Sequence, residues 1–353
     1  MLRHSVAVIS EMSASIPASF RKLVVKKLTP VFKEAVEIVQ QDLIRPRNNE
    51  ILIKNKYVGI NASDVNMAAG RYCSQNQSLP FGLGFESIGE IVDVGEKVAE
   101  LKIGESVMHM SYGAFSEYMC APEEEVISVA SAKPELLPLL TSGATASLSL
   151  DKCGHIVPGE KVLITAAAGG TGHIAVQWAK NVGCYVIGTC SSQDKVKFLE
   201  DIGCDRPINY TQECLNDVLT KEYPSGIDVI WETIGGETFN ILSKHLAIKG
   251  RLVIVGAISK YIESKLSYHM NSDLPMQLLL QSATLSGFLL PHFKSDIPHY
   301  LSLLVRLMHE KKIKLFIDDG RSQEKPFSGL EDIVRAMDYL YSGKNKGKVI
   351  VAL

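Results

Sequence analysis

The fold of this chain is decided by the stretch Lys161-Val-Leu-Ile-Thr-Ala-Ala-Ala-Gly-Gly-Thr-Gly-His-Ile-Ala-Val-Gln-Trp-Ala-Lys-Asn-Val-Gly183. Its apolar start, residues 162–165, predicts a buried strand, and residues 173–182 predict an apolar helix. Between them lies a turn of small residues, with an alanine where the first glycine of such turns is typical. Small residues let the backbone approach a pyrophosphate, whose charge the amides at the helix start then hold. The stretch predicts a dinucleotide-binding turn made by Ala167, Gly169, Gly170, Thr171 and Gly172.

The segments that follow this turn alternate between buried strands and helices. Strands are predicted at residues 161–165, 184–189, 228–232, 252–256 and 285–288. Helices are predicted over residues 193–202, 212–223 and 237–246. Such alternation implies a parallel sheet with right-handed crossovers. This context favours a dinucleotide site over the alternative, a glycine-rich turn in an α/β protein that binds no ligand.

The chain before residue 140 is β-rich, with short strands predicted at residues 51–58, 87–94, 106–110 and 114–120. A helix near residues 297–311 and a strand at 348–352 close the chain. We therefore predict an α/β fold, in which a doubly wound parallel sheet is inserted into a discontinuous β-rich domain. The predicted domains are a tail at 1–20, a β-rich domain at 21–140 and 293–353, and a dinucleotide-binding domain at 141–292.

Composition excludes several classes of protein. The 353 residues suffice for two domains, and a hydrophobic fraction of 46% is ordinary for a globular protein. A formal net charge of −2 gives no electrostatic case for binding nucleic acid or anionic membranes. No apolar run approaches the length of a membrane span. Seven cysteines without a C-x-x-C pair indicate free thiols in a reducing compartment, so we expect a cytoplasmic protein.

The tail at residues 1–20 is rich in Ser and Ala and carries one acid, Glu11. A frayed tail is favoured over the alternative, a weak mitochondrial presequence. A mitochondrial or peroxisomal location stays open beside the cytoplasmic one.

The segment after the second strand of the predicted sheet decides between NAD and NADP. An NAD site needs an Asp or Glu there, which bonds the adenosine ribose hydroxyls. Here Ser191 and Ser192 follow the strand, then Lys195 and later Tyr210, with no acid at the strand end. Hydroxyls and a cation suit a 2′-phosphate, so NADPH is the predicted cofactor. A compatible alternative is that Ser192 caps a helix on which Lys195 is solvated.

Four motifs occur in order: Asn61-Ala-Ser-Asp64, Gly84-Phe-Glu86-Ser-Ile-Gly89-Glu, the turn at 166–172 and Gly343-Lys-Asn-Lys-Gly-Lys-Val-Ile-Val351. Over about residues 21–353 the chain resembles the medium-chain dehydrogenase/reductase superfamily, in its quinone oxidoreductase and prostaglandin reductase branch. The resemblance implies a Rossmann-type nucleotide domain, a GroES-like catalytic domain, a cleft between them and a homodimer. It also implies NADPH-dependent reduction of α,β-unsaturated ketones, including 15-oxo-prostaglandins at the 13,14 double bond, and of quinones.

Zinc alcohol dehydrogenases of the same superfamily carry ligands that this chain lacks. They place a cysteine where Asn61 follows Gly-Ile, and a histidine where Phe85 stands in Gly84-Phe85-Glu86. A structural zinc lobe would need four closely spaced cysteines, which are also missing. No metal is predicted. Without a Lewis acid, hydride transfer to an electron-poor C=C bond is easier than carbonyl reduction, because the incoming charge spreads as an enolate.

The resemblance places three candidate catalytic residues at the cleft. Asn61 and Asp64 would order the nicotinamide side, although capping of a short helix is an equal alternative for Asp64. Tyr72 is the nearest phenol and would donate a proton or a hydrogen bond, while packing is the favoured alternative for it.

Further cofactor-binding residues come from the same resemblance. Ser142 and Thr145 lie where a cofactor-facing helix begins, and Gly256 belongs to the same site. Asn345 matches an asparagine that reaches the cofactor from the C-terminal segment, with a plain turn residue as its alternative.

The main hypothesis is an NADPH-dependent, zinc-independent reductase of a small hydrophobic enone. The alternatives are a quinone oxidoreductase with little enone activity and an NADPH-binding protein without turnover. Met270, Met276 and the leucines at 278–280 face either the substrate or a dimer partner.

Overall fold

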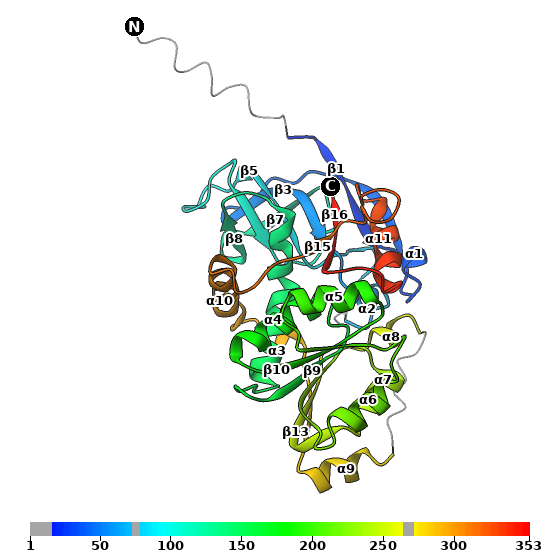
Figure 1. Ribbon diagram of the computed structural model, residues 1–353. Helices are drawn as coiled ribbons and strands as arrows, with labels where there is room; N and C mark the ends of the chain where they lie inside the picture. Colours follow the sequence, from blue (N-terminus) through cyan, green and yellow to red (C-terminus); the bar gives the residue numbers. More distant parts are fainter. Residues whose placement is uncertain (1–15, 73–77, 264–271) are drawn as a thin grey trace.

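The computed structural model describes residues 16–72, 78–263 and 272–353. Two lobes lie one above the other, a β-rich lobe and a lobe built on a parallel sheet (Figure 1). Most of the predicted tail lies outside the described residues, and the first strand begins at Ser19. No helix in the described part of the chain combines the length and apolar character that crossing a membrane requires.

A six-stranded parallel sheet forms the centre of the lower lobe, in the order β11-β10-β9-β12-β13-β14. Its strands are β9 (Lys161–Ile164), β10 (Tyr185–Cys190), β11 (Arg206–Asn209), β12 (Ile227–Glu232), β13 (Leu246–Ile254) and β14 (Thr284–Gly287). This is the strand order of a doubly wound dinucleotide fold, so the predicted fold class is confirmed. Strand β11 was missing from the predicted strands, because four residues that include Arg206 and Pro207 carry no apolar run.

Helices cover this sheet and join its strands. They are α3 (Thr141–Lys152), α4 (Gly172–Val182), α5 (Gln193–Asp201), α6 (Leu215–Glu222), α7 (Gly236–Ser243), α8 (Ile258–Tyr261), α9 (Leu274–Gln281), η3 (Leu290–Phe293) and α10 (Ile297–His309). The helices predicted from periodicity correspond to α5, α6 and α7. Helix α7 ends earlier than predicted, because β13 already begins at Leu246 and pairs with β12.

The upper lobe holds two sheets. The larger contains β3 (Glu50–Gly59), β5 (Ser87–Val94), β6 (Ser106–His109), β7 (Tyr118–Pro122), β8 (Val126–Val129), β15 (Ile317–Asp318) and β16 (Lys348–Ala352). The smaller contains β1 (Ser19–Val25), β2 (Val36–Asp42) and β4 (Phe81–Gly82). Short helices complete the lobe: α1 (Phe32–Ala35), α2 (Asp64–Ala68), η1 (Glu123–Glu125), η2 (Pro134–Leu139) and α11 (Asp332–Tyr341).

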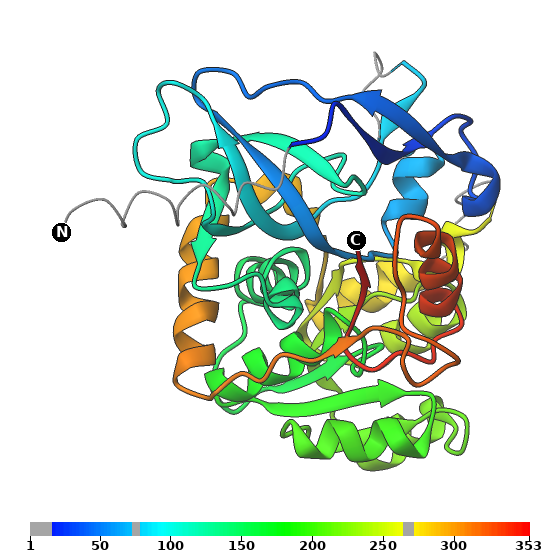
Figure 2. The ribbon, with the colours of Figure 1, turned by 90° about the horizontal axis from the view of Figure 1, so that it is seen from above.

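The C-terminal strand returns to the first lobe. Strand β16 pairs antiparallel with β3, with Ile350 opposite Gly59. Seen from above, the C-terminus lies between the orange helix α10 and the red helix α11 (Figure 2). The upper lobe is therefore built from both ends of the chain, which is the discontinuity that the strand pattern led us to expect.

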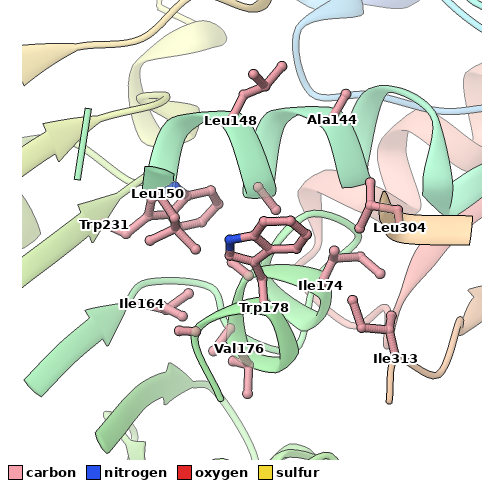
Figure 3. Close-up of a cluster of buried hydrophobic side chains, with 14 of the residues drawn as sticks. Ala144, Leu148, Leu150, Ile164, Ile174, Val176, Trp178, Trp231, Leu304 and Ile313 are labelled. Carbon is pink, nitrogen blue, oxygen red and sulfur yellow. The ribbon is translucent and has the colours of Figure 1, made fainter. Parts of the chain in front are cut away.

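Helix α3 connects the lobes through a shared core. Leu150 of α3 lies on the side of Trp178 of α4, Leu148 points to the opposite side of α3, and Leu304 of α10 lies at one end of the cluster (Figure 3). Leu304 of α10 packs against α3 at Gly143, where an added Cβ would lie 2.9 Å from a methyl group of Leu304. This packing holds the first turn of α3 at the mouth between the lobes.

Candidate active site

A cavity of about 1400 Å³ lies between the two lobes, at the carboxyl ends of the parallel strands. The strand order reverses between β10 and β12, on either side of β9, and ligands of doubly wound sheets bind at such a reversal. Residues from both lobes line the cavity, among them Asn61 and Phe85 above and Gly169 and Thr171 below. Its size exceeds what a single small substrate would need, and it suits a cofactor and a substrate together.

The turn between β9 and α4 has no room for larger residues. A Cβ added at Gly172 would overlap the carbonyl oxygen of Ala166. Ala167 is fully buried, and a Cβ added at Gly188 of β10 would lie 2.9 Å from its methyl group. Four residues of the predicted turn line the cavity, Gly169, Gly170, Thr171 and Gly172, whereas Ala167 packs behind them. The turn thus presents only backbone and small side chains to the cavity, as a pyrophosphate cradle requires.

The C-terminal segment holds this turn in place. The Gly347 amide donates to the Ala168 carbonyl at 2.9 Å, and Asn345 Nδ2 donates to the Gly347 carbonyl at 2.9 Å. His173 bonds the Gly169 carbonyl through Nδ1 at 2.9 Å. Burial lowers the pKa of His173 to about 4, so the ring is neutral at pH 7. Asn345 also lines the cavity, so the segment that fixes the turn itself faces a bound cofactor.

The far end of the cavity carries the residues predicted for a 2′-phosphate. Ser191, Lys195 and Tyr210 all line it, and Tyr210 is 53% exposed. Lys195 Nζ donates to the Gly343 carbonyl at 2.6 Å, and burial lowers the pKa of this ammonium. Ser192 does not line the cavity; its hydroxyl caps α5 by accepting from the Lys195 amide at 3.3 Å. Ser192 is therefore a helix cap, as the alternative interpretation held, but Lys195 is buried and not solvated as that interpretation expected.

A buried ion pair stands at the junction of the lobes. Lys348 Nζ lies 2.5 Å from Glu86 Oε1, and the two side chains are 2% and 0% exposed. Asn61 Oδ1 accepts from Lys348 Nζ at 2.6 Å, and Asn61 Nδ2 donates to Glu86 Oε1 at 2.9 Å. The second Glu86 oxygen accepts from the Thr141 amide at 2.8 Å. This cluster ties β16, the end of β3, the start of β5 and the start of α3 to one another.

Asp64 lies behind Asn61 and does not line the cavity. Its Oδ2 accepts from the Asn61 amide at 2.8 Å. Burial raises its pKa to about 8, in spite of the opposing effects of the Asn61 amide and the Lys348 charge, so the carboxyl is protonated at pH 7. Helix α2 starts at Asp64 without a side-chain capping bond from Ser63. Asp64 therefore fixes the loop that carries Asn61 and offers no contact to a ligand in the cavity.

The other predicted residues all face the cavity. Tyr72 lines it and is 38% exposed. Ser142 and Thr145, on the first turns of α3, and Gly256, after β13, line it as well.

The sequence did not indicate the role of Lys348, because a lysine before the apolar run Val349-Ile-Val is typical of a solvated strand end. Glu86 has a structural role here, since both of its carboxylate oxygens are bonded within the protein.

Apolar side chains from both lobes also line the cavity. They include Phe85, Met108, Met110, Ile127, Phe288 and Leu290. Met276, Leu279 and Leu280 of α9 do not line it and are 56%, 70% and 77% exposed. Leu278 is likewise absent from the lining, which favours the dimer interpretation for these residues. Met270 lies outside the described residues.

Comparison with known proteins assigns the family. Residues 47–131 match the family described as alcohol dehydrogenase GroES-like domain, and residues 170–306 match zinc-binding dehydrogenase. Prostaglandin reductase-3 from Mus musculus is 44% identical over 344 residues, which cover 96% of this chain and 91% of that protein. The chain belongs to the medium-chain dehydrogenase/reductase superfamily. The resemblance to its quinone oxidoreductase and prostaglandin reductase branch is confirmed.

Two further members of the superfamily support this assignment. A probable quinone oxidoreductase from Leishmania amazonensis is 42% identical over 96% of this chain and 99% of that protein. The crystal structure of Escherichia coli quinone oxidoreductase, complexed with NADPH, superposes with a TM-score of 0.80 at 26% identity, over 94% of this chain and 100% of that chain. As a member of this family of reductases, the chain is an oxidoreductase.

The description of one matching family names zinc, but the residues of this cleft do not fit a catalytic zinc ion. Such an ion takes three protein ligands from His, Cys, Asp and Glu. Among the residues that the structure describes, no three or more of these could hold a metal together. The nearby Glu86 is bonded to Lys348, Asn61 and Thr141 instead.

The buried ion pair generates a stability prediction. Replacing Lys348 by Met leaves Glu86 buried without its cation, and should lower the free energy of unfolding by about 3–5 kcal/mol. Adding Glu86→Gln to Lys348→Met should recover most of that loss, because the uncompensated charge is gone. Urea denaturation of the three proteins measures both effects.

An exposed pair provides the matched control. Lys26 and Glu37 are bonded at 3.1 Å with side chains 50% and 49% exposed, so Lys26→Met should cost less than about 1 kcal/mol. Equal losses for Lys348→Met and Lys26→Met would show that the buried pair does not hold the junction.

Proposed function

We propose that this protein uses NADPH to reduce the C=C bond of α,β-unsaturated ketones without zinc, as a reductase of the 15-oxo-prostaglandin 13-reductase type. One observation carries the proposal: a dinucleotide turn and apolar side chains of both lobes line a single cavity, and the acid beside it, Glu86, is bonded to Lys348. Such a cavity suits hydride transfer to an enone. The negative charge that the hydride brings is delocalised as an enolate, so no metal is needed to stabilise it. Prostaglandin reductase-3, at 44% identity, carries a name that agrees with this reaction.

The cofactor site has the features of one that prefers NADPH. Ser191, Lys195 and Tyr210 line the end of the cavity beside β10. Within the described residues, the acids that line the cavity are Glu124 and Glu125, and both belong to the upper lobe. No carboxylate of the lining is therefore placed beside β10 to bond the adenosine ribose hydroxyls, as an NAD site requires. NADPH, when bound, supplies the hydride. Lys195 would turn from the Gly343 carbonyl to the 2′-phosphate.

The protein's own residues orient and stabilise the reacting groups. The turn at Gly169 and Asn345 would position the cofactor, while apolar lining residues such as Phe85 and Met110 would pack against the substrate. The hydroxyls of Ser142, Thr145 and Tyr72 line the same cavity and would donate hydrogen bonds to the cofactor or to the developing enolate oxygen. Protonation at the α-carbon would come from water or from Tyr72. Asn61 lines the cavity too, but its side-chain amide is bonded to Lys348 and Glu86. It would therefore contribute van der Waals contacts to the ligand and not a free hydrogen-bond donor.

The cofactor assignment predicts a specific loss. Lys195→Ala should raise the KM for NADPH by about tenfold or more, since a charge-assisted hydrogen bond contributes about 1.5–3 kcal/mol. The KM for NADH should change little, because NADH carries no 2′-phosphate. Lys197→Ala, on the exposed face of the same helix, is the matched control and should leave both constants unchanged. An equal rise for NADPH and NADH in Lys195→Ala would contradict the assignment.

The reaction itself is tested by NADPH oxidation with 4-phenylbut-3-en-2-one and with 1,4-naphthoquinone. We expect turnover of the enone that persists after treatment with EDTA, because no step uses a metal. Asn345→Ala should lower kcat/KM by loosening the turn that holds the cofactor. Absence of turnover with both classes of substrate, or loss of activity in EDTA that zinc restores, would rule the proposal out.

Quinone reduction is the second candidate function. The relative from Leishmania amazonensis is named a probable quinone oxidoreductase at 42% identity, which favours it. The two activities are separated by the ratio of kcat/KM for the two substrates above, and a preference for the quinone would assign the second function.

We further propose a homodimer in the cytoplasm. Strand β14 lies at the edge of the described six-stranded sheet, and the neighbouring α9 exposes Met276, Leu279 and Leu280. Pairing of two such edges would cover these side chains. The six cysteines that the structure describes are free, which suits a reducing compartment.

The dimer proposal predicts a mass of twice 38.7 kDa in light scattering, and a shift toward the monomer in Leu279→Glu combined with Leu280→Glu. A wild-type monomer at micromolar concentration would refute it. A fluorescent fusion at the C-terminus that collects in an organelle would refute the cytoplasmic location.

A further inference from the structure

A chain of buried polar side chains crosses three neighbouring strands of the upper lobe and ends at the cavity. Asn55 of β3, Ser87 of β5 and His109 of β6 are 2%, 0% and 1% exposed. Ser87 Oγ lies 2.6 Å from Asn55 Oδ1 and 2.6 Å from His109 Nε2. His109 lines the cavity, whereas Asn55 and Ser87 lie behind it.

The hydrogen bonds fix the direction of this chain. Asn55 Nδ2 donates to the carbonyls of Ser116 at 2.7 Å and Ala114 at 3.3 Å, so its Oδ1 faces Ser87 as an acceptor. Ser87 must therefore donate its one proton to Asn55, and its lone pair accepts from His109. In a neutral imidazole only one nitrogen carries a proton, so His109 is protonated on Nε2 and its Nδ1 holds a free lone pair.

Burial keeps the His109 ring neutral. It lowers the pKa of His109 to about 4, although the charges of Glu86 and Glu125 act in the opposite direction. The Nδ1 atom is consequently an acceptor at pH 7. It is buried and has no hydrogen-bond partner within residues 16–72, 78–263 and 272–353.

A second unpartnered polar atom lies two residues further along. Ser111 Oγ is also buried without a hydrogen-bond partner in the described part of the chain, and Ser111 lines the same cavity. Met108, Met110 and Ile127 also line this part of the cavity, together with the polar side chains of Tyr112 and Glu125. A buried polar atom costs free energy unless something bonds it, and water, an ion or a polar group of a ligand can do so.

We propose that His109 and Ser111 form a polar contact for the substrate, in which His109 Nδ1 accepts a hydrogen bond from a substrate hydroxyl group. Ser111 supplies the complementary donor to the oxygen of that hydroxyl. A hydroxyl satisfies both atoms at once, whereas a carboxylate would set its oxygens against the bare lone pair of Nδ1. The substrate is therefore an enone that carries a hydroxyl group away from its double bond. This inference rests on the proposed function for the identity of the reacting group, but not for the contact itself.

The test compares hydroxylated enones with analogues that lack the donor. The probes are 4-phenylbut-3-en-2-one, its ortho-, meta- and para-hydroxyphenyl analogues, and the three methoxy analogues. In the wild-type protein, kcat/KM for at least one hydroxyl compound should exceed that of its methoxy partner by about three- to tenfold, which is the range of one neutral hydrogen bond. His109→Phe should bring that ratio close to one.

Two more variants separate the contact from a structural effect. Ser111→Ala leaves the Asn55–Ser87–His109 chain intact and should reduce the same ratio by about threefold. His309→Phe alters an exposed histidine of α10 and should leave every ratio unchanged. An unchanged ratio in both His109→Phe and Ser111→Ala, or no hydroxyl preference in the wild-type protein, would overturn the proposal.

Binding provides a readout that does not depend on turnover. Calorimetric titration of the hydroxyl and methoxy compounds into the protein saturated with NADP⁺ should show the same three- to tenfold preference, and its loss in His109→Phe. If no enone is reduced but this preference is present, the proposed reaction fails while the contact stands. If enones are reduced and no preference is found, the contact fails while the reaction stands.

Discussion

The ion pair between Lys348 and Glu86 is the constraint on which the cleft depends. Moving two charged groups out of water is unfavourable, and their mutual attraction offsets the cost only when the geometry is close and the remaining polar atoms are bonded. Here both conditions hold. The ammonium lies 2.5 Å from Glu86 Oε1 and also donates to Asn61 Oδ1, and the Thr141 amide donates to the second carboxylate oxygen. Any separation of the surrounding segments would expose an unpaired buried charge.

This pair also sets the geometry of the cofactor site. Lys348 follows Gly347, whose amide bonds the turn at Ala168, and a Cβ at Gly170 would lie 3.3 Å from the Cα of Lys348. Glu86 at the same time holds the first residue of α3, from which Ser142 and Thr145 face the cavity. The glycine turn, the helix start and the loop of Asn61 are thus positioned by one cluster. Lys348 provides the positive charge beside Glu86.

The periodicity of the sequence predicted most of the fold and the location of the cofactor turn. Small residues between an apolar strand and an apolar helix have few other structural solutions, and Gly172 has no room for a side chain. The sequence could not predict which charged side chains are buried, because their burial depends on partners far away in the chain. Lys348 is paired with a residue 262 positions earlier, by the difference of the two numbers, and Lys195 bonds a carbonyl at Gly343. The free lone pair of His109 could likewise not be predicted, because it follows from hydrogen bonds among side chains of three neighbouring strands.

The central claim is that hydride reaches a carbon–carbon double bond in a cleft without a metal. The most direct test is reduction of 4-phenylbut-3-en-2-one with NADPH that carries deuterium at the transferable position of C4, followed by NMR of the product. The account predicts a saturated ketone with deuterium on the β-carbon and an intact carbonyl group. An allylic alcohol with deuterium on the carbinol carbon would contradict it.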